Sequence, residues 1–233
     1  MLLLANKPQW RTSNDVVQYL KHKLKAKKCG HAGTLDPMAT GLMLLATDQD
    51  TKKLHENSGK DKSYLATIDL SAMSDTWDKE FREQFTQYEY TNMGIHINWW
   101  IHTRPTWDHI ITVLNSLTGG GAVSMPLPPF SAKKIDWKKR YDMARQGNTD
   151  IVYQDMIFHT IKIIDIAFPL VYISCHVASG TYIRSLAYRL ATKLWTGGIL
   201  VSLQRTSIGE YSLDQLVCND KDTKLAYSSI EIE

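Results

Sequence analysis

The chain has 233 residues, of which 43% are hydrophobic and 22% charged, so it can bury a sizeable core. No apolar run approaches the ~20 residues of a membrane helix. Lysine and arginine total 27 against 24 acidic residues, and a net charge of +3 does not by itself indicate nucleic-acid binding. Three cysteines without paired spacing argue against a disulfide scaffold and a zinc site, and we expect a cytoplasmic protein.

The first elements are a short strand and a basic helix. The apolar start, Met1–Ala5, lacks a cationic lead and a cleavage pattern, so it predicts a buried strand. Thr12–Asp15 then offers side-chain oxygens that can cap a helix, and apolar residues follow at helical spacing up to Leu24. The other face carries Lys21, Lys23, Lys25, Lys27 and Lys28. Such a run is ordinarily a solvated face, and contact with a polyanion is the alternative.

Residues 30–41, GHAGTLDPMATG, place the single carboxylate Asp36 among three glycines and directly before Pro37. Glycine lets a backbone approach a ligand closely, and proline stiffens the chain after the carboxylate. From these residues alone, Asp36 can be a nucleophile, a general base, a metal ligand or a turn-capping side chain. The apolar run Leu42–Thr47 predicts a buried strand after the loop.

The next segments are a strand, a loop and a region that is harder to interpret. Apolar and polar residues alternate over Lys62–Leu70, which predicts a half-buried strand with Tyr64 facing the interior or a cleft. A loop with Asp75 and Asp78 follows. Residues 86–124 gather histidines and tryptophans, which could form a base-stacking platform or a metal site, although such residues more often pack a surface element. An amphipathic helix ending at Gly119 is expected in this region.

The second half alternates strands and helices. An extended proline-rich segment, MPLPPFSAKK, precedes a short helix that ends at Gly147. TIKIIDIAF and LVYISCHVA predict strands, and YIRSLAYRLATKLW predicts a helix with Tyr182 and Arg184 in its first turn. We therefore expect an α/β (α+β) fold with a mixed, largely antiparallel sheet flanked by helices and loops.

GHAGTLDPMATG resembles the catalytic motif G-H-T/A-G-x-L-D-P-x-A-T-G of the TruB family of tRNA pseudouridine synthases. Further blocks resemble the family in the same order: NKPQWRTS, KSYLATIDL, SDTWD, PPFSAKKIDWKKRYDMARQG, ASGTYIRSLAYRL and LQRTSIGEYSLDQL. The resemblance implies the pseudouridine synthase fold and a catalytic domain over residues 1–217, with residues 86–124 poorly matched. The tail, residues 218–233, leaves no room for the PUA-type domain of longer members.

The resemblance also implies an activity and a set of site residues. The reaction would be isomerisation of a uridine in the T loop of tRNA, at family position 55. The enzyme would be a monomer that needs no metal or cofactor and does not bind a membrane. Asp36 would be the nucleophile, Tyr64 would stack on the flipped base and assist proton transfer, and Arg184 would pair with Asp36. The implied substrate-binding residues are His31, Tyr182, Leu203, Asp75, Lys7 and Lys134.

Two glycines of the family pattern are tryptophans here, Trp10 and Trp137. Because tryptophan does not adopt a positive φ cheaply, we expect rebuilt loops at both places. Two rival functions stay open. One is a tRNA-folding chaperone that keeps the cleft without turnover. The other is a hydrolase that pairs Asp36 with Asp75 or Asp78 as two carboxylates.

Overall fold

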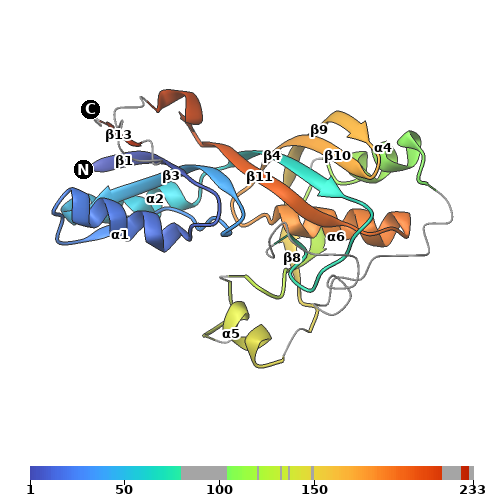
Figure 1. The fold of residues 1–233 in the computed structure, drawn as a ribbon, viewed down its shortest axis with the longest axis horizontal. Coiled ribbons are helices and arrows are strands. Elements are labelled where there is room, and N and C mark those ends of the chain that lie inside the picture. Colours follow the sequence, from blue (N-terminus) through green and yellow to red (C-terminus); the bar gives the residue numbers. More distant parts are fainter. Residues whose placement is uncertain are drawn as a thin grey trace. The chain divides into compact units, whose positions relative to one another are not determined.

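The structure is a computed structural model, and it describes residues 1–79, 104–119, 121–131, 133–135, 137–147, 150–216 and 227–230 (Figure 1). The chain forms two compact units. The first unit comprises Met1–Leu65, His176–Ser179 and Leu203–Glu233, and the second comprises Ala66–Cys175 and Gly180–Ser202. Within the described residues no helix is long and apolar enough to cross a membrane.

The first unit is built on strands in the order β13-β1-β3-β11. These are β13 (Tyr227–Ile230), β1 (Leu2–Lys7), β3 (Thr40–Thr47) and β11 (Ile199–Ile208), while β2 (Cys29–His31) pairs with β3 and β12 (Tyr211–Ser212) with β11. Every pairing is antiparallel except β3 with β11, which is parallel. The predicted mixed, largely antiparallel sheet is therefore confirmed.

Helix α1 (Ser13–Lys23) begins where the sequence predicts. The hydroxyl of Thr12 accepts a hydrogen bond from the amide of Asp15 at 3.1 Å, and the carboxylate of Asp15 accepts one from the amide of Thr12 at 2.8 Å. This reciprocal cap satisfies two of the amides that a helix start leaves unpaired. The buried face of α1 includes Val16, Val17 and Leu20, and Lys23, Lys25, Lys27 and Lys28 are exposed.

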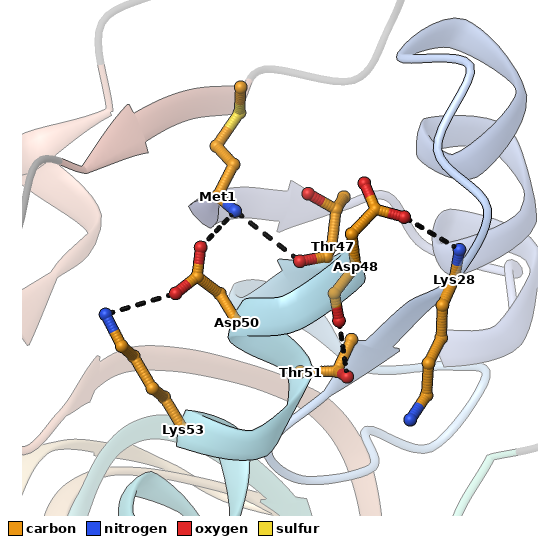
Figure 2. Close-up of polar contacts among 7 residues, drawn as sticks. All are labelled: Met1, Lys28, Thr47, Asp48, Asp50, Thr51 and Lys53. Carbon is orange, nitrogen blue, oxygen red and sulfur yellow. Dashed lines mark hydrogen bonds and ion pairs between the residues drawn. The ribbon is translucent and has the colours of Figure 1, made fainter.

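The far end of β3 leads into a short 3-10 helix, η1 (Asp48–Lys53), and then α2 (Leu54–Ser58). Figure 2 shows the surface contacts of η1, in which the carboxylate of Asp50 forms ion pairs with the amino terminus of Met1 and with the Nζ of Lys53. The carboxylate of Asp48 accepts the backbone amide of Lys28 at 3.1 Å. The ion pairs of Asp50 are solvent-exposed, so they contribute little to stability.

Three strands contribute residues to both units: β4 (Lys62–Asp69), β10 (Leu170–Val177) and β11. Burial alternates along β4 as the sequence predicts, with Tyr64, Ala66 and Ile68 buried. In the sheet β10 lies between β4 and β9 (Phe158–Ala167).

Among its described residues, the second unit also holds three helices and two small antiparallel pairs of strands. Helix α4 (Trp107–Asn115) starts at the cap residue Thr106 and packs against α6 (Ile183–Leu194). The antiparallel pairs are β5 (Val123–Pro126) with β8 (Tyr153–Met156), and β6 (Lys134–Ile135) with β7 (Lys138–Lys139), which precedes α5 (Arg140–Arg145). Most of the histidine- and tryptophan-rich segment, residues 86–103, lies outside the described residues.

The expectation of rebuilt loops at Trp10 and Trp137 is wrong. Both residues have a left-handed backbone, with φ of 63° and 67°. The chain keeps the turn that a glycine would adopt and places a tryptophan in it. The local strain of a side chain at positive φ is therefore present in both turns.

Candidate active site

Asp36 lies half-buried on the loop between β2 and β3, and the residue before it is held by α1. The amide of Leu35 donates to the hydroxyl of Ser13 at 2.8 Å, and that hydroxyl lies 3.2 Å from the carbonyl of Leu35, to which it donates. The carbonyl of Asp36 accepts the amide of Ala39 at 3.1 Å. Since Ser13 is in the first turn of α1, the helix fixes the approach of the chain to the carboxylate.

The residue after Asp36 is held from the other side by the turn that follows β1. The carbonyl of Pro37 accepts the amide of Trp10 at 2.8 Å and the ammonium of Lys7 at 3.1 Å. The same ammonium donates to the carbonyls of Arg11 and Pro8 at 2.6 and 3.0 Å. Lys7 is 0% exposed, and it joins two loops through three carbonyls. Its predicted contact with substrate stays a prediction.

Burial lowers the pKa of Lys7 from 10.5 to about 8, although the negative charge of Asp36 acts in the opposite direction. An ammonium moved out of water loses hydration, and carbonyl oxygens replace only part of it. The fold therefore holds the ammonium of Lys7 near the carboxylate of Asp36, and burying this charge costs hydration free energy.

His31 is half-buried at the start of the loop, where its Nδ1 accepts the amide of Gly33 at 3.2 Å. Because a backbone amide can only donate, a neutral His31 carries its proton on Nε2. Burial lowers the pKa of His31, and the positive charge of Arg205 adds to the effect. The imidazole is therefore neutral at pH 7, with one donor available for a ligand.

Two further buried cations lie on the same unit. Lys62 donates from Nζ to the carbonyls of Lys60 at 2.6 Å and Ser58 at 3.2 Å, and burial lowers its pKa to about 8, with a smaller effect from Arg205. Arg205 donates from Nε to the carbonyl of Leu42 at 2.7 Å. Sequence reasoning assigned neither cation to the site, because the residues around Lys62 in β4 and Arg205 in β11 do not show which carbonyls each side chain contacts.

Tyr64 and Leu203 complete the predicted site residues of the first unit. Both side chains are buried, and the carbonyl of Leu203 accepts the hydroxyl of Thr40 at 3.5 Å, at the end of the Asp36 loop. The structure therefore brings Lys7, His31, Asp36, Tyr64 and Leu203 into one compact unit.

Arg184 lies in the second unit, in the first turn of α6, where it is almost fully buried. Its Nε lies 3.5 Å from a carboxylate oxygen of Asp78, and its two other nitrogens donate to the carbonyls of Thr76 at 3.1 Å and Phe130 at 2.9 Å. Asp78 is the acid that sequence reasoning missed as a partner of Arg184. Its signal was present, since SDTWD has a second acid three residues after Asp75.

The other predicted residues of the second unit differ in exposure. Asp75 is exposed, whereas Tyr182 is half-buried just before α6 and donates its amide to the sulfur of Met156 at 3.4 Å. The backbone of Lys134 lies in β6, and its side chain falls outside the described part of the chain. Asp36 and Arg184 lie in different units, so their pairing stays a prediction.

The chain matches one protein family and several of its members. A sequence model of the TruB family pseudouridylate synthase (N terminal domain) matches residues 21–183. A tRNA pseudouridine synthase B of Fusobacterium nucleatum is 34% identical over 217 residues, 91% of this chain and 69% of the relative. The protein of the same name from Parabacteroides distasonis is 31% identical over 240 residues, 100% of this chain and 96% of the relative.

Solved structures share the fold. A chain in the crystal structure of a Cbf5-Nop10-Gar1 complex superposes with a TM-score of 0.64 at 23% identity. The match covers 90% of this chain and 50% of that chain, so this chain spans half the length of that structural relative.

Proposed function

The chain belongs to the TruB family of pseudouridylate synthases, and from this membership we propose that it isomerises uridine to pseudouridine in tRNA. The observation that carries the proposal is the support of Asp36. Its two neighbours in the chain are hydrogen-bonded to separate elements, Leu35 to Ser13 of α1 and Pro37 to Lys7 of β1. A carboxylate held in this way is presented in one direction, as a nucleophile requires.

The reaction breaks the N-glycosidic bond of the uridine and forms a bond from the same ribose carbon to C5 of the base. The base detaches from the ribose at N1, rotates, and reattaches to the same ribose carbon through C5, which loses its proton while N1 gains one. The carboxylate of Asp36 is the proposed nucleophile, and the attack can be on the ribose or on the uracil ring. Composition and oxidation state are unchanged, so the chemistry requires no external oxidant or reductant.

The remaining site roles are part of the same proposal. The uridine must leave its stack at a cost of about a few kcal/mol, and the ring of Tyr64 replaces part of the lost stacking and assists proton transfer. Arg184 pairs with Asp36 in the bound state, and His31, Tyr182, Leu203, Asp75, Lys7 and Lys134 line or support the nucleotide site. A guanidinium suits this role because it pairs with a carboxylate in a fixed geometry.

The proposed partner is the T stem-loop of tRNA, bound by one protein molecule in the cytoplasm. The exposed lysines at the end of α1 and directly after it support phosphate contacts: Lys23, Lys25, Lys27 and Lys28. Such contacts recognise the shape of a folded RNA more than its sequence. The catalytic domain of the proposal is residues 1–217.

The test is pseudouridine mapping on an unmodified tRNA and on its isolated T stem-loop, with an anticodon stem-loop as the specificity control. We expect product with the native protein and none with Asp36→Asn, which retains tRNA binding. Asp50→Asn is the matched control, because it makes the same change at the exposed acid of Figure 2. Product from Asp36→Asn would overturn the nucleophile assignment. Binding without product in the native protein would indicate the chaperone, and cleavage would indicate the hydrolase.

A further inference from the structure

We propose that Arg205 is a positioning residue that holds the Asp36 loop in its reactive shape. Its guanidinium donates from Nε to the carbonyl of Leu42 at 2.7 Å and from Nη2 to the carbonyl of Gly33 at 3.2 Å. Gly33 precedes Asp36 in the chain and Leu42 follows it, so a single side chain joins the two ends of the loop. Arg205 is 1% exposed and is not available for contact with an RNA.

The backbone of Arg205 is fixed to the same loop. In the parallel pairing of β11 with β3, Arg205 is opposite Gly41. A Cβ added to Gly41 would lie 2.3 Å from the carbonyl oxygen of Arg205 and 2.6 Å from its nitrogen, and Gly41 has a φ of 107°. The two strands therefore approach each other as closely as a glycine allows. The guanidinium then extends from this fixed point back along the loop.

Arginine suits this task better than lysine. Two carbonyls that lie in different directions need donors in different directions, and the planar guanidinium supplies them without losing its charge. Without the guanidinium, the buried carbonyl of Leu42 and the partly buried carbonyl of Gly33 would each lose a donor, and the loop would move to find others.

The inference rests on the proposed function, since Asp36 is taken as the reacting group. A displaced loop changes the rate of the chemical step, because a shift of about 1 Å in a reacting group can cost about 100-fold. Affinity for tRNA changes little, because Arg205 is buried. The expected signature is therefore a fall in the single-turnover rate with an almost unchanged dissociation constant.

The experiment compares Arg205→Met, Arg205→Lys and the control Leu4→Ala. Leu4 is buried in β1 of the same unit and its apolar side chain cannot hydrogen-bond to the guanidinium, so its variant lowers stability while the hydrogen bonds of Arg205 to Gly33 and Leu42 remain. We expect Arg205→Met to lose about 100-fold in rate per folded molecule, Arg205→Lys to recover part of it, and Leu4→Ala to keep the native rate. Equal losses in Arg205→Met and Leu4→Ala would overturn the proposal.

Two further readouts do not depend on the proposed reaction. Hydrogen exchange of the amides of residues 33–42 should be faster in Arg205→Met than in Leu4→Ala, because the loop opens locally. The pKa of His31, followed by NMR, should rise in Arg205→Met, because the neighbouring positive charge is removed. If the native protein makes no pseudouridine, the proposed function fails. The hydrogen exchange and the pKa of His31 still test whether Arg205 holds the Asp36 loop. Unchanged exchange and an unchanged His31 pKa would overturn it.

A separate observation concerns four tryptophans. Among the described residues, Trp10, Trp77, Trp137 and Trp195 have φ values of 63°, 61°, 67° and 56°. Trp137 is 93% exposed and Trp195 is 85% exposed, so burial does not compensate for a backbone that disfavours any Cβ by about 1–2 kcal/mol. Trp195 follows helix α6 as its left-handed cap, a position at which glycine is common.

We infer that the backbone at these four positions is built for glycine, and that the source organism inserts glycine there. The codon UGA is read as tryptophan under some genetic codes and as glycine under others, so one codon assignment accounts for all four positions. Trp77 is the least obvious member, because its ring stacks on that of Tyr188 with centroids 4.2 Å apart. It still has the same left-handed φ as the other three.

Mass spectrometry of peptides from the protein in its native source tests the inference directly. We expect glycine at the four positions and UGA codons in the gene, and tryptophan in those peptides would overturn the inference. In recombinant protein, Trp137→Gly and Trp195→Gly should each raise the melting temperature by about 2–4 °C. Trp107→Gly is the control, because Trp107 begins helix α4, and it should lower the melting temperature. No rise for Trp137→Gly and Trp195→Gly would contradict the backbone argument.

Discussion

Arg205 of the first unit and Arg184 of the second are both almost fully buried, and the two arginines have different partners. Arg205 of the first unit donates to the carbonyls of Gly33 and Leu42, which fix the shape of a loop. Arg184 of the second unit also donates to two carbonyls, but its Nε faces the buried carboxylate of Asp78. Arg205 therefore acts as a structural clamp, whereas Arg184 takes part in a buried ion pair.

The two arrangements respond differently when the arginine is substituted. A clamp on carbonyls loses hydrogen bonds when it is removed, and the loss is local. A buried ion pair leaves an uncompensated charge when one partner is removed, which costs more than the pair contributes when intact. Substitutions of Arg205 and Arg184 should therefore differ in the amount of stability they remove. They should also differ in whether a second substitution restores that stability.

The largest effect is expected for Arg184→Met. Because Asp78 would remain as a buried carboxylate without its nearest cation, we expect a loss of about 3–5 kcal/mol in the free energy of unfolding. Adding Asp78→Leu should recover most of that loss without recovering activity on tRNA. Urea unfolding of the two single variants and the double variant measures the coupling. An additive double variant would show that the pair is not coupled.

A smaller effect is expected where the first unit is most closely packed. Gly41→Ala places a Cβ 2.3 Å from the carbonyl of Arg205, so the strands must separate, and we expect a loss of about 2–4 kcal/mol. Gly147→Ala is the control, since Gly147 also has a positive φ, of 87°, but has open space around it. It should cost only about 1 kcal/mol. Equal losses of stability in Gly41→Ala and Gly147→Ala would show that the positive φ causes the loss, and not the close approach to Arg205.

The buried lysines of the first unit should give stability a pH dependence. The folded pKa of Lys7 and of Lys62 is about 8, below the unfolded value of 10.5. Between these pH values the unfolded chain binds more protons, so the free energy of unfolding rises with pH. We expect a rise of about 2 kcal/mol from each lysine between pH 7.5 and pH 10, since each unit of pKa difference corresponds to about 1.4 kcal/mol. Urea unfolding at pH 7.5 and pH 10 should show the rise, and Lys7→Met should reduce it. A fall with pH in this window would contradict the assignment.

The smallest effect is expected for Ser13→Ala. The hydroxyl of Ser13 exchanges hydrogen bonds with the amide and the carbonyl of Leu35, and removing it should cost about 1 kcal/mol. The rate of the chemical step should fall modestly, because Asp36 follows directly. Ser116→Ala removes an exposed hydroxyl bond to the carbonyl of Val113, and both stability and rate should stay near native. A matching loss in Ser116→Ala would show that the effect is not specific to the loop.

The local features of the fold could be predicted from the sequence. The cap of α1 at Thr12, the alternation of β4 around Tyr64 and the glycine-bracketed loop of Asp36 are all found in the structure. Each depends on residues within a few positions of one another, where side-chain spacing and backbone preference determine the conformation. The motif of residues 30–41 also identified the family, because its residue types and spacing are specific.

The supports of the site were decided by the tertiary structure. Arg205 lies 163 residues from Leu42 and 172 from Gly33, and Arg184 lies 108 from Thr76. Sequence patterns could not show that Lys7 contacts three carbonyls or that Asp78 faces Arg184, because a buried cation satisfies whichever acceptors the packed chain brings to it. The sequence determined which residue reacts in the proposed mechanism, and long-range packing decided which residues hold it in place.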